Sequence, residues 1–170
     1  YMAWGEHGCG ILEYSDYSVL ENFLPEWEEA VERDFNHPCI ICWCPFNETS
    51  IHQNPEVLLT VYRITKKLDP TRPVVDASGS VHVKTDIFDV HDYEQDVNIF
   101  RKRYEEDLVL NGKVFLNCPQ KEKYEGQPYF VSEYGGIWWN PGQNDDKAWG
   151  YGSRPSGIDE LIERYKGLTE

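Results

Sequence analysis

Four stretches of the chain predict helices: in three of them apolar residues recur at helical spacing, and the third along the chain is a charged helical stretch. These stretches cover residues 20–35, 54–68, 98–109 and 156–165. We expect Pro25 near the start of the first helix, because a proline further inside removes a helical hydrogen bond. Asn54 and Pro55 supply the cap and first residue of the second helix, and Ser156 is expected to cap the last.

Short apolar runs between these helices predict strands. Residues 39–44 read Cys-Ile-Ile-Cys-Trp-Cys, and a run that is apolar on both faces is typical of a parallel strand covered on both sides. Further strands are predicted over residues 73–78, 87–91 and 129–132, the last one breaking at Glu133. Alternating strands and helices indicate an α/β fold, and 170 residues are expected to form one domain.

Composition and charge narrow the classes of partner. Acidic residues outnumber basic ones by 30 to 16, so the surface repels polyphosphate, and neither nucleic acid nor an anionic membrane is expected as a partner. Aromatic residues make up 14% of the chain and offer stacking surfaces to a neutral ligand such as a sugar. The start, Tyr1-Met2-Ala3-Trp4, is apolar like the interior of a fold, so we expect a segment of a longer parent chain.

The cysteines argue against a disulfide framework. There are five, Cys9, Cys39, Cys42, Cys44 and Cys118, and an odd number cannot all pair within one chain. The middle three admit a metal site, but no second paired cluster accompanies them, so small buried strand residues are the favoured interpretation. We expect neither a metal nor a cofactor.

Two carboxylates stand at the ends of predicted buried strands. Glu48 follows Pro45-Phe46-Asn47, and Glu133 ends the last strand, at the edge where catalytic groups collect in parallel βα folds. A pair of acids is the minimal equipment for glycoside hydrolysis. The two lie 85 residues apart, close to three barrel units of about 31 residues each. An acid-rich chain also places some carboxylates at strand ends by chance.

Three segments carry a more specific signal. They are residues 36–48 (Asn-His-Pro-Cys-Ile-Ile-Cys-Trp-Cys-Pro-Phe-Asn-Glu), residues 89–94 (Asp-Val-His-Asp-Tyr-Glu) and residues 130–136 (Phe-Val-Ser-Glu-Tyr-Gly-Gly). In this order they resemble the acid/base segment, an intervening strand and the nucleophile segment of glycoside hydrolase family 2. That family includes β-galactosidases, β-glucuronidases and β-mannosidases. The resemblance implies a (β/α)8 TIM barrel and a retaining mechanism, with the acid/base after the fourth strand and the nucleophile after the seventh.

The resemblance assigns roles to individual residues. Glu48 would be the general acid/base and Glu133 the nucleophile, with their carboxyl groups about 5–5.5 Å apart as retention requires. Asn47 would bond the sugar 2-hydroxyl, although a turn residue is the alternative interpretation.

Three more residues complete the expected substrate site. His91 and Tyr93 match a His-x-Tyr pattern in which the tyrosine bonds the nucleophile and the histidine faces the sugar. A polar pair at a strand end is the alternative. Trp138 follows the nucleophile closely and would stack on the sugar, unless it packs in the core.

The resemblance also implies an incomplete barrel. Residues 1–170 would form a single segment of the catalytic domain, from the end of strand three through the helix after strand seven. The remaining strands and an N-terminal β-sandwich would belong to the parent chain, so we expect the isolated segment to be inactive or poorly stable. β-Galactosides are the favoured substrates. β-Glucuronides, β-mannosides and a non-catalytic carbohydrate-binding barrel remain alternatives.

Overall fold

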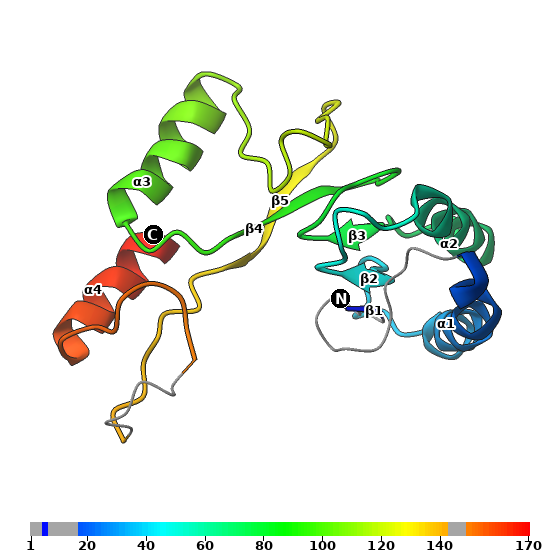
Figure 1. Cartoon of the computed structure of the whole chain (residues 1–170), viewed down its shortest axis with the longest axis horizontal. Coiled ribbons are helices and arrows are strands. Elements are labelled where there is room, and N and C mark those ends of the chain that lie inside the picture. The colour runs from blue at the N-terminus through cyan, green and yellow to red at the C-terminus, as the bar shows by residue number, and fades with distance from the viewer. Residues whose placement is uncertain (1–4, 7–16, 143–148) are drawn as a thin grey trace. The chain divides into compact units, whose positions relative to one another are not determined.

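The computed structural model describes residues 5–6, 17–142 and 149–170 (Figure 1). The chain divides into two compact units. The first comprises Tyr1–Val90 and Leu116–Ser132, and the second comprises His91–Phe115 and Glu133–Glu170. The apolar start of the chain and Cys9 lie outside the described residues.

Two predicted helices belong to the first unit. A short 3-10 helix, η1 (Tyr17–Val19), leads into α1 (Leu20–Asp34), and α2 spans Pro55–Leu68. The Asn54 side chain caps α2 by accepting a hydrogen bond from the Glu56 amide, as predicted. Pro25 was expected near the start of its helix, but it lies inside α1. The reason is burial, since Leu20 and Phe23 are buried on the N-terminal side of the proline and hold that turn in the helix.

A small parallel sheet lies beside these helices (Figure 1). Its strands are β1 (Gly5–Glu6), β2 (Phe46–Asn47) and β3 (Ala77–Ser78), in that order. Both pairings are parallel, and Phe46 stands in register with Gly5 on one side and Ala77 on the other. A helix follows β2 and returns the chain to β3, as the predicted βα alternation requires.

The paired strands are shorter than the apolar runs suggested. Within residues 39–44 only Trp43 forms a bridge, to Val74, and regular pairing begins at Phe46. Ile41 is 75% exposed, so the expectation of cover on both sides is wrong for the first half of the run. Apolarity marks where a strand can be buried, whereas the neighbouring strand decides where the ladder forms.

One apolar cluster joins α1, α2 and the sheet. Its buried members are Leu20, Phe23, Trp27, Val31, Trp43, Phe46, Val57, Leu58, Val61, Val74 and Ala77. Both buried indoles also satisfy their N–H groups: Trp27 donates to Thr65 Oγ1 and Trp43 to Asp69 Oδ2, each at 2.8 Å. A buried N–H without a partner costs free energy, so these hydrogen bonds favour one orientation of each indole ring in the core.

Two further strands confirm the last predicted strand positions. β4 (Phe88–Asp92) and β5 (Tyr129–Tyr134) form a two-stranded sheet, and each contributes residues to both units. Glu133 lies inside β5, so the expectation that the strand breaks there is wrong by two residues. Its backbone is therefore held by a strand conformation rather than by a loop.

The second unit is mainly helical. α3 (Val97–Arg101) continues directly into a π-helix, η2 (Lys102–Leu110), which confirms the predicted third helix, and α4 (Ile158–Thr169) packs against α3. The expected cap of α4 is wrong, because the N-cap is Gly157. Ser156 instead donates from its amide and hydroxyl to the Glu160 carboxylate, at 2.8 and 2.7 Å.

The four described cysteines, Cys39, Cys42, Cys44 and Cys118, are free thiols. Cys42 and Cys44 are buried, and burial raises the pKa of the Cys42 thiol. A neutral buried thiol is a poor metal ligand, which favours the packing interpretation for Cys42 and Cys44. Cys39 is exposed, so the expectation of a small buried residue is wrong at that position. Within the described part of the chain, no helix has the length and apolarity needed to cross a membrane.

A buried charge ties three strands of the first unit together. The His82 ring is 4% exposed; its Nδ1 lies 2.7 Å from Asp76 Oδ1 and its Nε2 lies 2.9 Å from the Asp89 carbonyl oxygen. Asp89, in β4, also accepts hydrogen bonds from the hydroxyl groups of Ser78 in β3 and Ser132 in β5. Burial of the ring opposes its charge, but the bonds to the two aspartates outweigh it and raise the pKa of His82 to about 10.

This network predicts a stability that falls with rising pH. The contribution of His82 is complete below its ordinary pKa of 6.5 and is lost as the pH passes the folded-state pKa of about 10. The slope is at most about 1.4 kcal/mol per pH unit. The pH dependence of stability is measured by hydrogen exchange at the Val83 and Lys84 amides, which donate to Asp76, after correction for intrinsic exchange rates. A His82→Gln variant with the same pH dependence would contradict the assignment.

Candidate functional site

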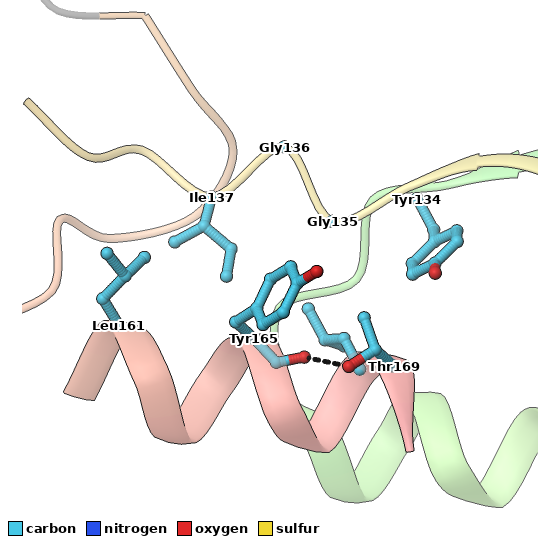
Figure 2. Close-up of a pocket in the computed structure, with 8 residues that line it drawn as sticks. Tyr134, Gly135, Gly136, Ile137, Leu161, Tyr165 and Thr169 are labelled. Carbon is cyan, nitrogen blue, oxygen red and sulfur yellow. Dashed lines mark hydrogen bonds between the residues drawn. The ribbon is translucent and has the colours of Figure 1, made fainter. Parts of the chain in front are cut away.

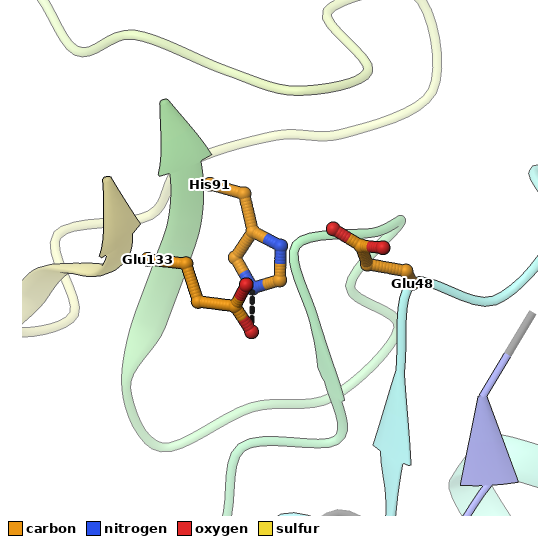
Figure 3. A group of neighbouring side chains, drawn as sticks. All are labelled: Glu48, His91 and Glu133. Atoms are coloured by element: carbon orange, nitrogen blue, oxygen red, sulfur yellow. Dashed lines mark ion pairs between the residues drawn. The ribbon is translucent and has the colours of Figure 1, made fainter. Parts of the chain in front are cut away.

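Glu48 directly follows β2 and leaves the strand through a strained backbone (Figure 3). Its amide still donates to the Ser78 carbonyl oxygen at 2.8 Å, so the pairing of β2 with β3 extends to this residue. Its φ of 46° is positive, and no other non-glycine residue in the described ranges shares that property. A left-handed backbone costs an L-residue about 1–2 kcal/mol, so the neighbouring pairing must hold Glu48 there.

Asn47 precedes it and lies within β2. It stands in register with Ser78 of β3 and Glu6 of β1, and it is 8% exposed. The alternative of a turn residue is therefore wrong. A polar side chain at the end of a buried strand is placed by the sheet on both sides.

Three predicted residues of the second unit come together. The Tyr93 hydroxyl donates a hydrogen bond to Glu133 Oε2. His91 Nε2 lies 3.4 Å from Glu133 Oε1, as Figure 3 shows. His91 belongs to β4, and Tyr93 is the first residue after that strand. The ring centroids of His91 and Tyr93 lie 6.0 Å apart. The His91 side chain is 3% exposed and that of Glu133 is 37% exposed. The carboxylate is thus held from its protein side and open to solvent on another.

Trp138 lies half-buried in the segment that follows β5. Its backbone runs so close to Gly150 that a Cβ at position 150 would stand 2.3 Å from Trp138 Cα. Ile137 forms a parallel bridge with Tyr151, so residues 149–151 run alongside this segment. The stacking role of Trp138 remains a prediction.

Neighbouring aromatic residues were missed from the sequence. The Tyr151 ring stacks on Tyr93 with centroids 3.8 Å apart and planes 6° from parallel. Trp149, 82% exposed, lies 5.4 Å from Tyr151 by ring centroids. The Trp149-Gly150-Tyr151 run offered an aromatic signal, but nothing local tied it to residue 93.

A cavity of about 390 Å³ opens nearby, between the segment after β5 and α4 (Figure 2). It is lined by Tyr134, Gly135, Gly136, Ile137, Leu161, Tyr165, Leu168 and Thr169. None of the six predicted site residues is among them, so this cavity is separate from the carboxylate arrangement.

The predicted site residues divide between the two units. Asn47 and Glu48 belong to the first, and His91, Tyr93, Glu133 and Trp138 to the second. The spacing of about 5–5.5 Å between the Glu48 and Glu133 carboxyl groups stays a prediction. A half-exposed carboxylate that accepts a hydroxyl hydrogen bond is equipped to act as a nucleophile or as a base.

Comparison with known proteins adds an independent finding. Residues 11–149 match the family model described as glycosyl hydrolases family 2, TIM barrel domain. The chain is 33% identical over 118 residues to β-galactosidase BgaC of Bifidobacterium adolescentis, covering 65% of this chain and 10% of that protein. It is 30% identical over 146 residues to a β-galactosidase of Psychromonas ingrahamii, covering 79% of this chain and 13% of that protein.

A β-glucuronidase of Homo sapiens is also similar. It is 35% identical over 75 residues, which cover 43% of this chain and 12% of that protein. The chain therefore spans only 10% to 13% of the length of these three relatives.

The strained backbone at Glu48 predicts an unusual order of stabilities. Glu48→Gly and Glu48→Ala both remove the carboxylate, but only glycine adopts a positive φ freely. We expect the glycine variant to have the larger free energy of unfolding, by about 1 kcal/mol. Urea denaturation of the two variants measures the difference, and a more stable alanine variant would show that residue 48 is unstrained.

Proposed function

Because this chain belongs to glycosyl hydrolase family 2, to its TIM barrel domain, we propose that the protein carrying it is a retaining β-glycosidase. The observation that carries the proposal is the Glu133 carboxylate, half-exposed and bonded by Tyr93 beside His91. A nucleophile needs this combination of fixed orientation and access to substrate.

Hydrolysis proceeds in two displacements. In the first, a Glu133 oxygen forms a bond to the anomeric carbon while the glycosidic C–O bond breaks, and Glu48 gives its proton to the leaving oxygen. In the second, Glu48 takes a proton from water, the water oxygen attacks the anomeric carbon, and the bond to Glu133 breaks. Two inversions restore the original configuration, and both glutamates return to their starting protonation states.

The other predicted residues support these steps. Tyr93 fixes the carboxylate by its hydrogen bond, and His91, which lies beside the same carboxylate, is the residue expected to face the bound sugar. Asn47 donates to the 2-hydroxyl as charge develops at the anomeric carbon. Trp138 offers an apolar face to the sugar ring.

The strands are assigned to the barrel in chain order. β1 is the end of the third strand, β2 the fourth, β3 the fifth, β4 the sixth and β5 the seventh. Residues 1–170 then form one segment of the barrel, and the longer protein supplies the remaining strands and an N-terminal β-sandwich. Phe130 and Tyr134 of β5 are 50% and 45% exposed, which supports their being covered by other parts of the longer protein. The segment alone is therefore expected to be inactive.

β-Galactosides are the proposed substrates. The two β-galactosidases align with a larger share of this chain than the β-glucuronidase does. The net charge of −14 also disfavours an anionic sugar such as glucuronate. β-Glucuronides and β-mannosides are the alternatives that a substrate panel separates.

Substitution of the two glutamates in the full-length protein tests the mechanism. Glu133→Gln is expected to abolish turnover of an aryl β-galactoside, because the amide cannot form the glycosyl ester. Glu48→Gln should lower kcat by about 10²–10⁴-fold, and the loss in kcat/KM should be smaller for substrates with good leaving groups. Azide should restore its turnover and yield a β-galactosyl azide, since this anion needs no general base.

The control is Glu163→Gln, an exposed glutamate on α4, which should leave the rates unchanged. Normal turnover by Glu133→Gln would refute the assignment of the nucleophile. Sugar binding without any turnover by the unaltered protein would favour a non-catalytic carbohydrate-binding barrel.

A further inference from the structure

One glutamine links the segments that carry Tyr93 and Glu133. The Gln95 amide nitrogen donates to the Tyr93 carbonyl oxygen at 3.0 Å and to the Gly135 carbonyl oxygen at 2.6 Å. Both partners are acceptors, which fixes the orientation of the amide group. Gly135 stands two residues after Glu133, so this side chain joins the backbone on either side of the Tyr93–Glu133 hydrogen bond.

Tyr151 holds the same pair from another direction. Its ring stacks on Tyr93, and its amide donates to the Gly136 carbonyl oxygen at 2.9 Å. Gly136 has a φ of 59°, and a Cβ there would stand 2.8 Å from the Tyr151 ring. This close approach places the ring against the turn that follows β5, so Tyr93 cannot shift without displacing Tyr151.

Because of the cavity beside α4, the position of the segment after β5 depends on these contacts. Gly135 and Gly136 line it, so close packing against the helix is missing where the chain leaves β5 (Figure 2). Two glycines in succession bring no side chains of their own to fix the segment. The bonds from Gln95 and Tyr151 are the contacts that hold its position against Tyr93.

We infer that Gln95 and Tyr151 are positioning residues that keep the Tyr93 hydroxyl on the Glu133 carboxylate. The inference rests on the proposed function, since it assumes that Glu133 is the nucleophile. Neither residue needs to touch the substrate. A loosened Tyr93 would let the carboxylate leave its attacking geometry, and a misplacement of about 1 Å can cost as much as about 10²-fold in rate.

The fold of the second unit does not depend on the glutamine. Asp92 accepts hydrogen bonds from Arg103 at 2.6 Å and from Tyr104 at 2.8 Å, which ties β4 to the helix η2. Gln95 Oε1 is buried and has no hydrogen-bond partner among the described residues. Gln95→Met would remove this unsatisfied acceptor along with the two bonds, so the variant should fold.

A double-mutant cycle in the full-length protein tests the inference. Gln95→Met is expected to lower kcat for an aryl β-galactoside about 10- to 100-fold, with KM changing less than about twofold. In the presence of Tyr93→Phe the same substitution should cost almost nothing more, because Gln95 acts through the tyrosine hydroxyl. Gln127→Met, which removes a glutamine hydrogen bond of the first unit, is the matched control and should leave kcat unchanged.

The outcomes separate the two proposals. Losses from Gln95→Met and Tyr93→Phe that multiply independently would overturn the positioning role, as would an unchanged kcat. If Gln95→Met does not fold, Tyr151→Leu enters the same cycle with Tyr93→Phe and the same expectation. Absence of turnover in the unaltered protein, or normal turnover by Glu133→Gln, would instead refute the function on which the inference rests.

Discussion

A buried histidine charge holds three strands of the first unit at one point. His82 lies between two aspartates, and one of them, Asp89, also binds hydroxyl groups of Ser78 in β3 and Ser132 in β5. These bonds fix where β5 stands along β4. Because Ser132 immediately precedes Glu133 within β5, the same interaction fixes the strand register at the candidate nucleophile. A one-residue slip would turn that carboxylate to the other face.

Each glutamate is held by a different physical means. Glu48 sits at the end of a two-residue strand in a left-handed backbone, which the bond from its amide to Ser78 sustains. Glu133 lies in a regular strand. Its carboxylate is oriented by His91 of β4 and by Tyr93, the first residue after β4. The paired backbone thus fixes the position of one acid and hydrogen bonding fixes the carboxylate of the other, and the proposed two-step displacement needs both groups in place.

The sequence predicted features whose cause is local. Apolar periodicity located α1 and α2, and Asn54 marked a helix start, because these depend on neighbours within a few residues. The sequence did not reveal the role of Gln95, because its acceptor Gly135 is 40 residues away, and it did not reveal the burial of the His82 charge. The family-like segments identified Tyr93 and its place beside Glu133, whereas periodicity alone gave only two acids at strand ends. Strand lengths were overestimated, since pairing depends on the neighbouring strand.

The claim that Glu133 is the nucleophile of a retaining enzyme is tested most directly by trapping. The full-length protein is exposed to a 2-deoxy-2-fluoro-β-galactoside, which accumulates the covalent glycosyl-enzyme, and the adduct is located by peptide mapping. The account predicts one sugar per chain, attached to Glu133. An adduct on another carboxylate would contradict it, and so would turnover of galactosides with inversion and no adduct.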